Sequence, residues 1–238
     1  AFAYKSDKDL KNARFLFKTM HFSWFVAIGT RLTPIIMKIG LPVHGIIRRT
    51  IFKQFVGGET LDETSTVAKK LDEYNVQVIL DYGVEGKEGE ENFDHAKDEF
   101  SKVINYASTQ PNIPFMSIKV TGFARFALLE KLHSAMQKAA GTLMKRYLAS
   151  VESLAANEKE EWHKVRLRTQ QLCEEADEKN VGILIDAEET WIQDPVDALT
   201  ILMMDVFNKK KPVIYNTLQL YRHDRLQFLK DCYTAAAE

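Results

Sequence analysis

The sequence lacks the residue patterns of several common enzyme classes. It has two cysteines, Cys173 and Cys232, which are far apart and without metal-ligand spacing. Two such cysteines predict reduced thiols in a reducing compartment. A Cys/His metal cluster, a glycine-rich phosphate loop and a Gly-x-Ser-x-Gly elbow are also missing. We therefore expect no metal site, and hydrolase and nucleoside triphosphatase functions have little support.

An excess of charge of one sign is missing as well. The chain of 238 residues has 32 Lys and Arg against 33 Asp and Glu. Phosphate binding needs clustered basic residues, so we expect no nucleic-acid partner. With 45% hydrophobic residues, the chain can bury a core of ordinary size, and a single α/β domain is the natural interpretation.

A long hydrophobic run is the third absence. The most apolar stretch, residues 15–41, is interrupted too often for a membrane span, by Lys18, His21, Arg31, Pro34 and Lys38. Helices packed on the protein's own surface are the favoured interpretation, and peripheral contact with a membrane is the alternative. Residues 1–56 as a whole have helical spacing of apolar groups and predict an N-terminal helical arm.

Four short apolar runs that each end in a polar residue are the main positive signal. Helix-like stretches follow them, which predicts parallel strands alternating with helices. In such a barrel, residues at the carboxyl ends of the strands converge on one mouth, where barrel enzymes place their chemistry. The runs are residues 76–80, 115–118, 182–185 and 212–218, and the residues that follow them are Asp81, Lys119, Asp186 and Gln219.

Four strand–helix units make only half of an eight-stranded barrel. The predicted fold is therefore α/β, the first half of a (β/α)8 TIM-type barrel over residues 57–238, preceded by the arm. The region 125–178 is longer than one crossover helix requires, so we expect an inserted helix there. A half barrel leaves strand edges and its inner face open. We expect the C-terminal half of the barrel to be absent from this chain.

Lys119 is the sharpest single candidate. At a barrel mouth its ammonium group could clamp a substrate carboxylate, or act as a Schiff-base nucleophile if burial lowered its pKa. A lysine that pairs with Asp186 for stability alone is the structural alternative. Asp186 itself could orient a cation, bind a hard metal or serve as an acid or base. Glu188 and Glu189 are more simply explained as first-turn acids of the following helix.

Two further strand ends offer polar groups. Thr217 and Gln219 would share one face of their strand, and the Gln219 amide suits the edge of a heterocyclic cofactor as well as a buried structural role. Asp81 is either a strand-end acid near the pocket or a turn-forming residue beside Gly83.

At these residues the sequence resembles the proline dehydrogenase family. No single motif is decisive, but five occur in order, from about residue 54 to the end. They are Gln54-Phe-Val-Gly-Gly-Glu-Thr60, Ile79-Leu-Asp-Tyr-Gly-Val-Glu85, Ser117-Ile-Lys-Val120, Ile185-Asp-Ala-Glu-Glu189 and Asn216-Thr-Leu-Gln-Leu-Tyr221. The family's fifth strand, with its Arg and Gly-Ala-Tyr segment, and its later pair of arginines have no counterpart.

The resemblance implies a βα barrel with FAD over the strand ends and specific roles for the strand-end residues. Lys119 would hold the substrate carboxylate, and Asp81 would lie at the substrate pocket. Asp186 and Ala187 would contact the active site and FAD, and Thr217 and Gln219 would line the flavin. The implied reaction is oxidation of L-proline to 1-pyrroline-5-carboxylate, with hydride transfer to the flavin N5 and electrons passed to a quinone.

The resemblance also implies a location and leaves alternatives. The protein would be cytoplasmic or peripheral to the inner membrane in a bacterium, and mitochondrial in a eukaryote. This chain alone is expected to be inactive, because the missing strands complete the site. A barrel lyase or aldolase that uses Lys119, and an inactive half barrel whose open edge mediates association, are the alternatives.

Overall fold

The computed structural model describes residues 2–39, 44–83 and 88–237. Contacts within the chain divide it into two compact units, Ala1–Gln77 and Val78–Glu238. The boundary expected from the sequence lies between residues 56 and 57, where the helical arm would meet the predicted barrel half. It is not the same division as the one that the contacts give. Val84 and Glu85, which end the second family motif, lie outside the described residues.

The first unit is entirely helical in its described part. Ser6 starts the first helix with a capping box, because its hydroxyl accepts a hydrogen bond from the Asp9 amide and the Asp9 carboxylate accepts one from the Ser6 amide. Thr60 caps the last helix by accepting from the Glu63 amide at 3.3 Å. The helices are α1 (Asp7–Met20), α2 (Ser23–Lys38), α3 (His44–Ile47), the π-helical turn η1 (Arg48–Phe52), α4 (Lys53–Phe55) and α5 (Leu61–Asp72).

Apolar side chains of this unit are mostly exposed. Phe15 on α1 is 70% exposed and Trp24 on α2 is 63% exposed. Ala68 on α5 is the one buried hydrophobic residue among the unit's described residues. None of the helices in the described ranges combines the length and the apolar character that crossing a bilayer requires.

The second unit is built on a four-stranded parallel sheet with strand order β1-β2-β3-β4. Its strands are β1 (Ile79–Asp81), β2 (Phe115–Ile118), β3 (Gly182–Ile185) and β4 (Ile214–Asn216). Helix α6 (Glu90–Ser108) joins β1 to β2, helix α10 (Gln193–Phe207) joins β3 to β4, and α11 (Arg225–Ala237) follows β4. The predicted alternation of parallel strands and helices is therefore confirmed.

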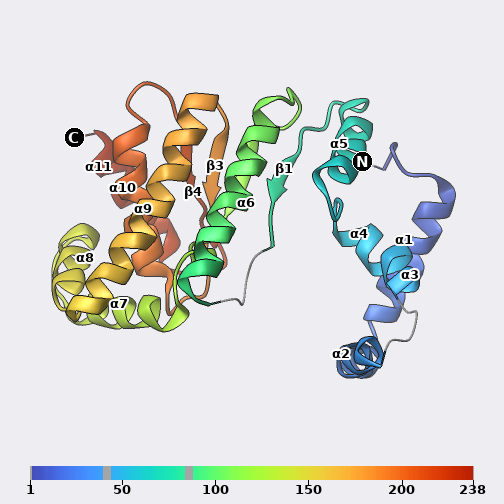
Figure 1. Cartoon of the computed structure of the whole chain (residues 1–238), viewed down its shortest axis with the longest axis horizontal. Helices are drawn as coiled ribbons and strands as arrows, with labels where there is room; N and C mark the ends of the chain where they lie inside the picture. Colours follow the sequence, from blue (N-terminus) through green and yellow to red (C-terminus); the bar gives the residue numbers. More distant parts are fainter. Residues whose placement is uncertain (1, 40–43, 84–87, 238) are drawn as a thin grey trace. The chain divides into compact units, whose positions relative to one another are not determined.

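The connection between β2 and β3 contains more helices than a single crossover needs. A 3-10 turn, η2 (Val120–Gly122), is followed by α7 (Phe126–Lys138), α8 (Leu143–Glu152) and α9 (Ala156–Lys179). Helices α6 and α9 lie side by side in Figure 1, and Arg168 on α9 binds Asp94 and Glu90 of α6 at 2.8 and 2.5 Å. The extra helical material expected between the second and third strands is present.

The two faces of the sheet differ in burial. Helix α6 packs on β2, α9 on β3 and α10 on β4, and the residues that point toward these helices are fully buried. They are Met116, Ile118, Ile183, Ile185 and Ile214. Alternate residues point to the other face, where Ile79 is 52% exposed and Phe115, Leu184 and Tyr215 are half-buried. We call this second, apolar face the inner face, because it would point inward in the predicted barrel.

A glycine at the start of β3 makes room for two aromatic rings on the inner face. Phe115 and Tyr215 meet edge to face with ring centroids 5.4 Å apart. A Cβ on Gly182 would lie 2.3 Å from Cδ1 of Phe115 and 3.3 Å from Cε2 of Tyr215. The strand can therefore hold only glycine at this position while the rings stay where they are.

Candidate functional site

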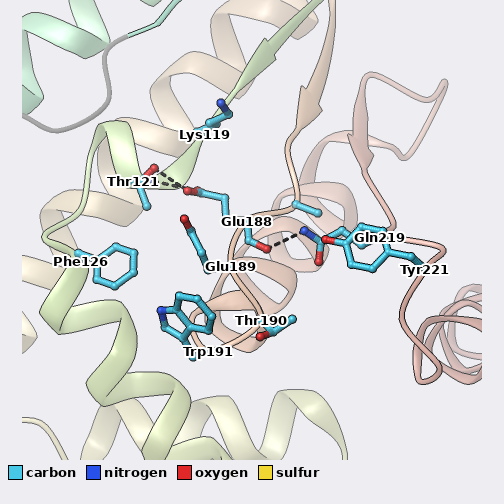
Figure 2. Close-up of a pocket in the computed structure, with 10 residues that line it drawn as sticks. Lys119, Thr121, Phe126, Glu188, Glu189, Thr190, Trp191, Gln219 and Tyr221 are labelled. Carbon is cyan, nitrogen blue, oxygen red and sulfur yellow. Dashed lines mark hydrogen bonds between the residues drawn. The ribbon is translucent and has the colours of Figure 1, made fainter. Parts of the chain in front are cut away.

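A cavity of about 560 Å³ opens at the carboxyl ends of β2, β3 and β4. Its lining comes from segments far apart in the sequence, which the parallel sheet brings to one edge. Figure 2 shows Phe126 and Trp191 on one side of this pocket and Gln219 and Tyr221 on another. The lining residues are Lys119, Thr121, Phe126, Ala187, Glu188, Glu189, Thr190, Trp191, Gln219 and Tyr221.

Glu188 links the segments that form the pocket through its hydrogen bonds. Its carboxylate accepts hydrogen bonds from the amide and the hydroxyl of Thr121, at 3.0 and 2.5 Å. Its own amide donates to Oε1 of Gln193 at 2.7 Å, and its carbonyl accepts from Nε2 of Gln219 at 2.8 Å. Figure 2 shows the bonds to Thr121 and Gln219. The ends of β2, β3 and β4 are thus joined through one residue.

Burial sets the protonation behaviour of Glu188. Only 8% of the residue is exposed, and this loss of hydration raises the pKa of the carboxyl group above its usual range. The two bonds from Thr121 and the positive charge of Lys119 act in the opposite direction on the pKa but do not cancel the effect. The interpretation of Glu188 as a first-turn acid is wrong, because α10 begins at Gln193 and the side chain turns toward Thr121.

Gln219 presents a free acceptor at the pocket. Its Nε2 is held by the Glu188 carbonyl, which fixes the orientation of the amide. The opposite atom, Oε1, is buried and has no hydrogen-bond partner. A buried amide oxygen without a partner is costly, so this atom suits a ligand that carries an N–H donor.

Thr217 is used differently from Gln219. Its hydroxyl accepts a hydrogen bond from the Ala187 amide at 2.5 Å and donates to the Ile185 carbonyl at 3.1 Å. The hydroxyl hydrogen is therefore already engaged, and Thr217 holds the end of β4 against the end of β3. Thr217 is not among the residues that line the pocket, whereas Ala187 is.

Lys119 and Asp186 follow β2 and β3 at neighbouring positions. Ile118 pairs with Ile185 in the register, and the Asp186 amide donates to the Ile118 carbonyl at 2.9 Å. The next residues along the two strands are Lys119 and Asp186, which are therefore neighbours on adjacent strands at the carboxyl end of the sheet. Lys119 lines the pocket, while Asp186 lies beside it and is half-buried.

Asp81 is the candidate that lies apart from the others. It ends β1, is exposed, and pairs in register with Ser117, two positions before Lys119. It is not among the lining residues. No group of three or more metal-binding side chains occurs in residues 2–39, 44–83 and 88–237.

Sequence reasoning missed Thr121, Phe126, Trp191 and Tyr221 as lining residues. Each comes after a strand end rather than at the predicted polar residue itself: Thr121, Trp191 and Tyr221 lie in turns, and Phe126 is the first residue of α7. Their nearness to a strand end was the available signal. Nothing in the local sequence indicates that the pocket would have aromatic walls.

Comparison with known proteins identifies the family. A family model for proline dehydrogenase matches residues 64–238. The carbapenem antibiotics biosynthesis protein CarD of Pectobacterium carotovorum is 32% identical over 77% of this chain and 45% of its own length. Mitochondrial proline dehydrogenase 1 of Dictyostelium discoideum is 28% identical over 81% of this chain and 38% of its own. The chain thus spans less than half the length of these relatives.

A solved structure supports the fold. Proline utilization A (PutA) from Bdellovibrio bacteriovorus, in a crystal structure of the protein inactivated by N-propargylglycine, superposes with a TM-score of 0.57. The match covers 79% of this chain and 19% of that chain, at 15% identity. The family match extends over most of the chain and includes every residue of the pocket, and on that ground this chain belongs to the proline dehydrogenase family.

Proposed function

We propose that this chain carries half of the active site of an FAD-dependent proline dehydrogenase, which oxidises L-proline to 1-pyrroline-5-carboxylate and passes the electrons to a quinone. The observation that carries the proposal is the pocket itself. Three features meet at the ends of β2, β3 and β4. They are Lys119, the Gln219 amide with its fixed orientation and unpartnered acceptor, and the five consecutive loop residues 187–191. These strand ends form the edge at which barrel enzymes bind their ligands.

The residues present fit a flavin. Gln219 Oε1 is an acceptor for a ring N–H donor, and Ala187 also lines the pocket. Thr217 links the end of β4 to Ala187, and the Asp186 amide links the end of β3 to Ile118 of β2. When bound, FAD supplies the acceptor for the hydride that leaves the carbon next to the ring nitrogen of proline.

Lys119 supplies the matching group for the substrate. Its ammonium is a point charge that can neutralise the carboxylate of proline and fix the ring in the pocket. Asp186, adjacent to Lys119 across the sheet edge, orients this cation. Asp81 is proposed for the substrate side of the completed site, although it lies outside the pocket of the described residues.

The inner face of the sheet supports a barrel that continues beyond these strands. It exposes Ile79 and leaves Phe115, Leu184 and Tyr215 half-buried. Further strands would cover this face and pair with the open edges of β1 and β4. We therefore propose the (β/α)8 barrel, with residues 57–238 as its first half and residues 1–56 as a helical arm that precedes it.

The acceptor and the location follow from the same proposal. A quinone dissolves in a bilayer, so the enzyme would approach a membrane from the side, and the exposed apolar side chains of α1 and α2 suit peripheral contact. Several relatives are named as mitochondrial. We propose a location at the inner membrane or in the cytoplasm of a bacterium, and in the mitochondrion of a eukaryote.

The test is the visible absorption spectrum of the purified protein without oxygen, before and after addition of L-proline. It is recorded for this chain and for a longer form that carries the rest of the barrel. A flavin band that bleaches with proline in the longer form supports the proposal. Absence of flavin from the longer form contradicts it, and flavin in the longer form alone shows that the later strands complete the site.

A further inference from the structure

A buried carboxylate on α10 is the centre of a network below the pocket. Asp197 is 1% exposed, and three side chains from different segments donate to it. Its Oδ1 accepts from Nε2 of Gln193 at 2.9 Å and from Nδ2 of Asn216 at 3.1 Å. Its Oδ2 accepts from Nη1 of Arg225, at the start of α11, at 2.6 Å. Both oxygens of the carboxylate are therefore occupied.

Gln193 extends this network to the pocket loop. Its side chain is buried, donates to Asp197 and accepts from the Glu188 amide at 2.7 Å. The reversed amide would place its NH2 group against the Glu188 N–H and its oxygen against the Asp197 carboxylate. Asp197 thus determines which way the Gln193 amide points, and with it the direction of the Glu188 backbone.

Asn216 extends the network to the other wall. It is the last residue of β4 and precedes Thr217 and Gln219, which face Ala187 and Glu188. The same carboxylate therefore binds the loop after β3 through Gln193 and the end of β4 through Asn216. These are the two segments that supply Ala187, Glu188 and Gln219 to the pocket.

We propose that Asp197 is a positioning residue, which holds the loop 187–191 and the end of β4 in the arrangement that forms the ligand pocket. The inference rests on the proposed function only in that the pocket is taken as the ligand site. The carboxylate charge is needed because all three groups that face Asp197 are donors. An asparagine there would direct an N–H at another donor and remove the charge that Arg225 Nη1 faces, which leaves Asp224 as the carboxylate partner of Arg225.

Trp191 makes the loop visible in solution. It lies on the loop and is 53% exposed, whereas Trp162 is 1% exposed and donates to the Tyr147 hydroxyl. The only other tryptophan, Trp24, is also exposed, so the experiment uses a Trp24→Phe variant as the parent protein. Acrylamide quenching of this parent then reports Trp191.

The test compares Asp197→Asn and Gln193→Met in the Trp24→Phe parent. We expect the quenching constant of Trp191 to rise about twofold in both, because the loop opens locally without unfolding of the sheet. Gln193→Met leaves the Asp197–Arg225 ion pair intact, so it decides the question if Asp197→Asn does not fold. Arg168→Gln is the matched control, because it breaks the two ion pairs of a buried arginine between α6 and α9, and these do not touch the loop.

Unchanged Trp191 quenching in the folded variants would overturn the proposal. A fall in their unfolding midpoints without a change in quenching would show that the network around Asp197 only stabilises the fold. An equal rise in Arg168→Gln would overturn the proposal too. In a longer form that binds flavin, both loop variants should also weaken flavin binding. The quenching result stands whether or not flavin binds, so failure of the proposed function and failure of this inference are distinguishable.

Discussion

At the residue scale, Lys119 and Glu188 act on each other across the pocket. The positive charge of Lys119 lowers the pKa of the Glu188 carboxyl, while burial of that carboxyl raises it more strongly. A change at Lys119 therefore alters both the charge offered to a ligand and the protonation of a residue that joins three strand ends. The two effects can be separated by comparing ligands with and without a carboxylate.

Replacement of Lys119 by alanine should weaken the binding of proline and of carboxylate-bearing analogues, by about tenfold or more, because the ligand charge loses its partner. Titration of the longer, flavin-loaded form by absorbance measures this. Lys131→Ala is the control, since Lys131 pairs with Glu158 on the exposed surface of α7 and α9. Unchanged affinity in Lys119→Ala would remove Lys119 from the site.

Gly182→Ala should destabilise the second unit by about 1–3 kcal/mol, because the new methyl group forces the Phe115 ring out of place. Urea unfolding measures the loss. Phe115→Leu in the same chain should restore part of it. Gly29→Ala on α2 is the control, because a Cβ there meets nothing within 4 Å. Equal stability of Gly182→Ala and the parent would show that the ring adjusts freely.

His133 on α7 should make stability depend on pH. Burial lowers its pKa; Arg222 and Arg146 also disfavour its charge, and Asp194 favours it. The unfolded chain therefore binds more protons than the folded chain below the ordinary histidine value of about 6.5. Stability should be full above that pH and fall as the pH drops through it. In His133→Gln, the midpoint of urea unfolding should change less with pH than in the parent between about pH 7.5 and pH 5.

At the element scale, local patterns predict the elements better than their ends. The Thr60 cap, the four strands and the helix inserted after β2 follow from residue type and spacing. Asp194-Pro195 has the pattern of a helix cap followed by proline at the first helical position, but α10 begins at Gln193, so Asp194 already lies in its first turn. The Asp194 carboxylate instead accepts from Gln137 and Arg146, which lie on α7 and α8. Its role is decided by packing between helices, which local sequence does not record.

The candidate site shows the same limit. Lys119 and Gln219 could be placed at the pocket because parallel strands bring their carboxyl ends to one edge, whereas Ala187 was implied only by the family resemblance. The hydrogen bonds between Glu188 and Thr121 could not be predicted, because these residues are 67 positions apart and neither has an unusual local pattern. Asp197 and Arg225 meet across 28 positions for the same reason. Their roles depend on tertiary contacts alone.

Thr121→Val tests the link between η2 and the loop after β3. Loss of the hydroxyl removes one of two donors to a buried carboxylate, so we expect a loss of about 1–3 kcal/mol and a further rise in the Glu188 pKa. Urea unfolding at about pH 7 and pH 5 measures both, because protonation of Glu188 should reduce the penalty. Thr66→Val on α5, where the hydroxyl is exposed, is the control. Similar losses in both variants would contradict the link.

At the scale of the whole molecule, the open inner face of the sheet governs behaviour in solution. Within the described part of Val78–Glu238, helices α6, α9 and α10 pack on one face, and the other keeps Ile79 half exposed. An apolar face beside an unpaired strand edge favours association between copies. The chain by itself should therefore form concentration-dependent oligomers.

Ile79→Lys should shift the chain toward the monomer, because it places a charge on the open face and the edge strand. Sedimentation velocity over a range of concentrations measures the shift. Leu148→Lys on α8 is the control, since Leu148 is similarly exposed on a helix. An equal effect of both substitutions would show that association does not use the sheet.

The four hydrogen bonds of Glu188 have a consequence for synthesis of the protein. Their partners, from Thr121 to Gln219, all belong to one continuous stretch of chain. A ribosome that has released residues 78–225 has therefore delivered every group that shapes the pocket wall and the network beneath it. Because chains begin to fold from their N-terminal side as they emerge, this wall can form early in synthesis, and in the proposed barrel it would be the template on which the further strands assemble.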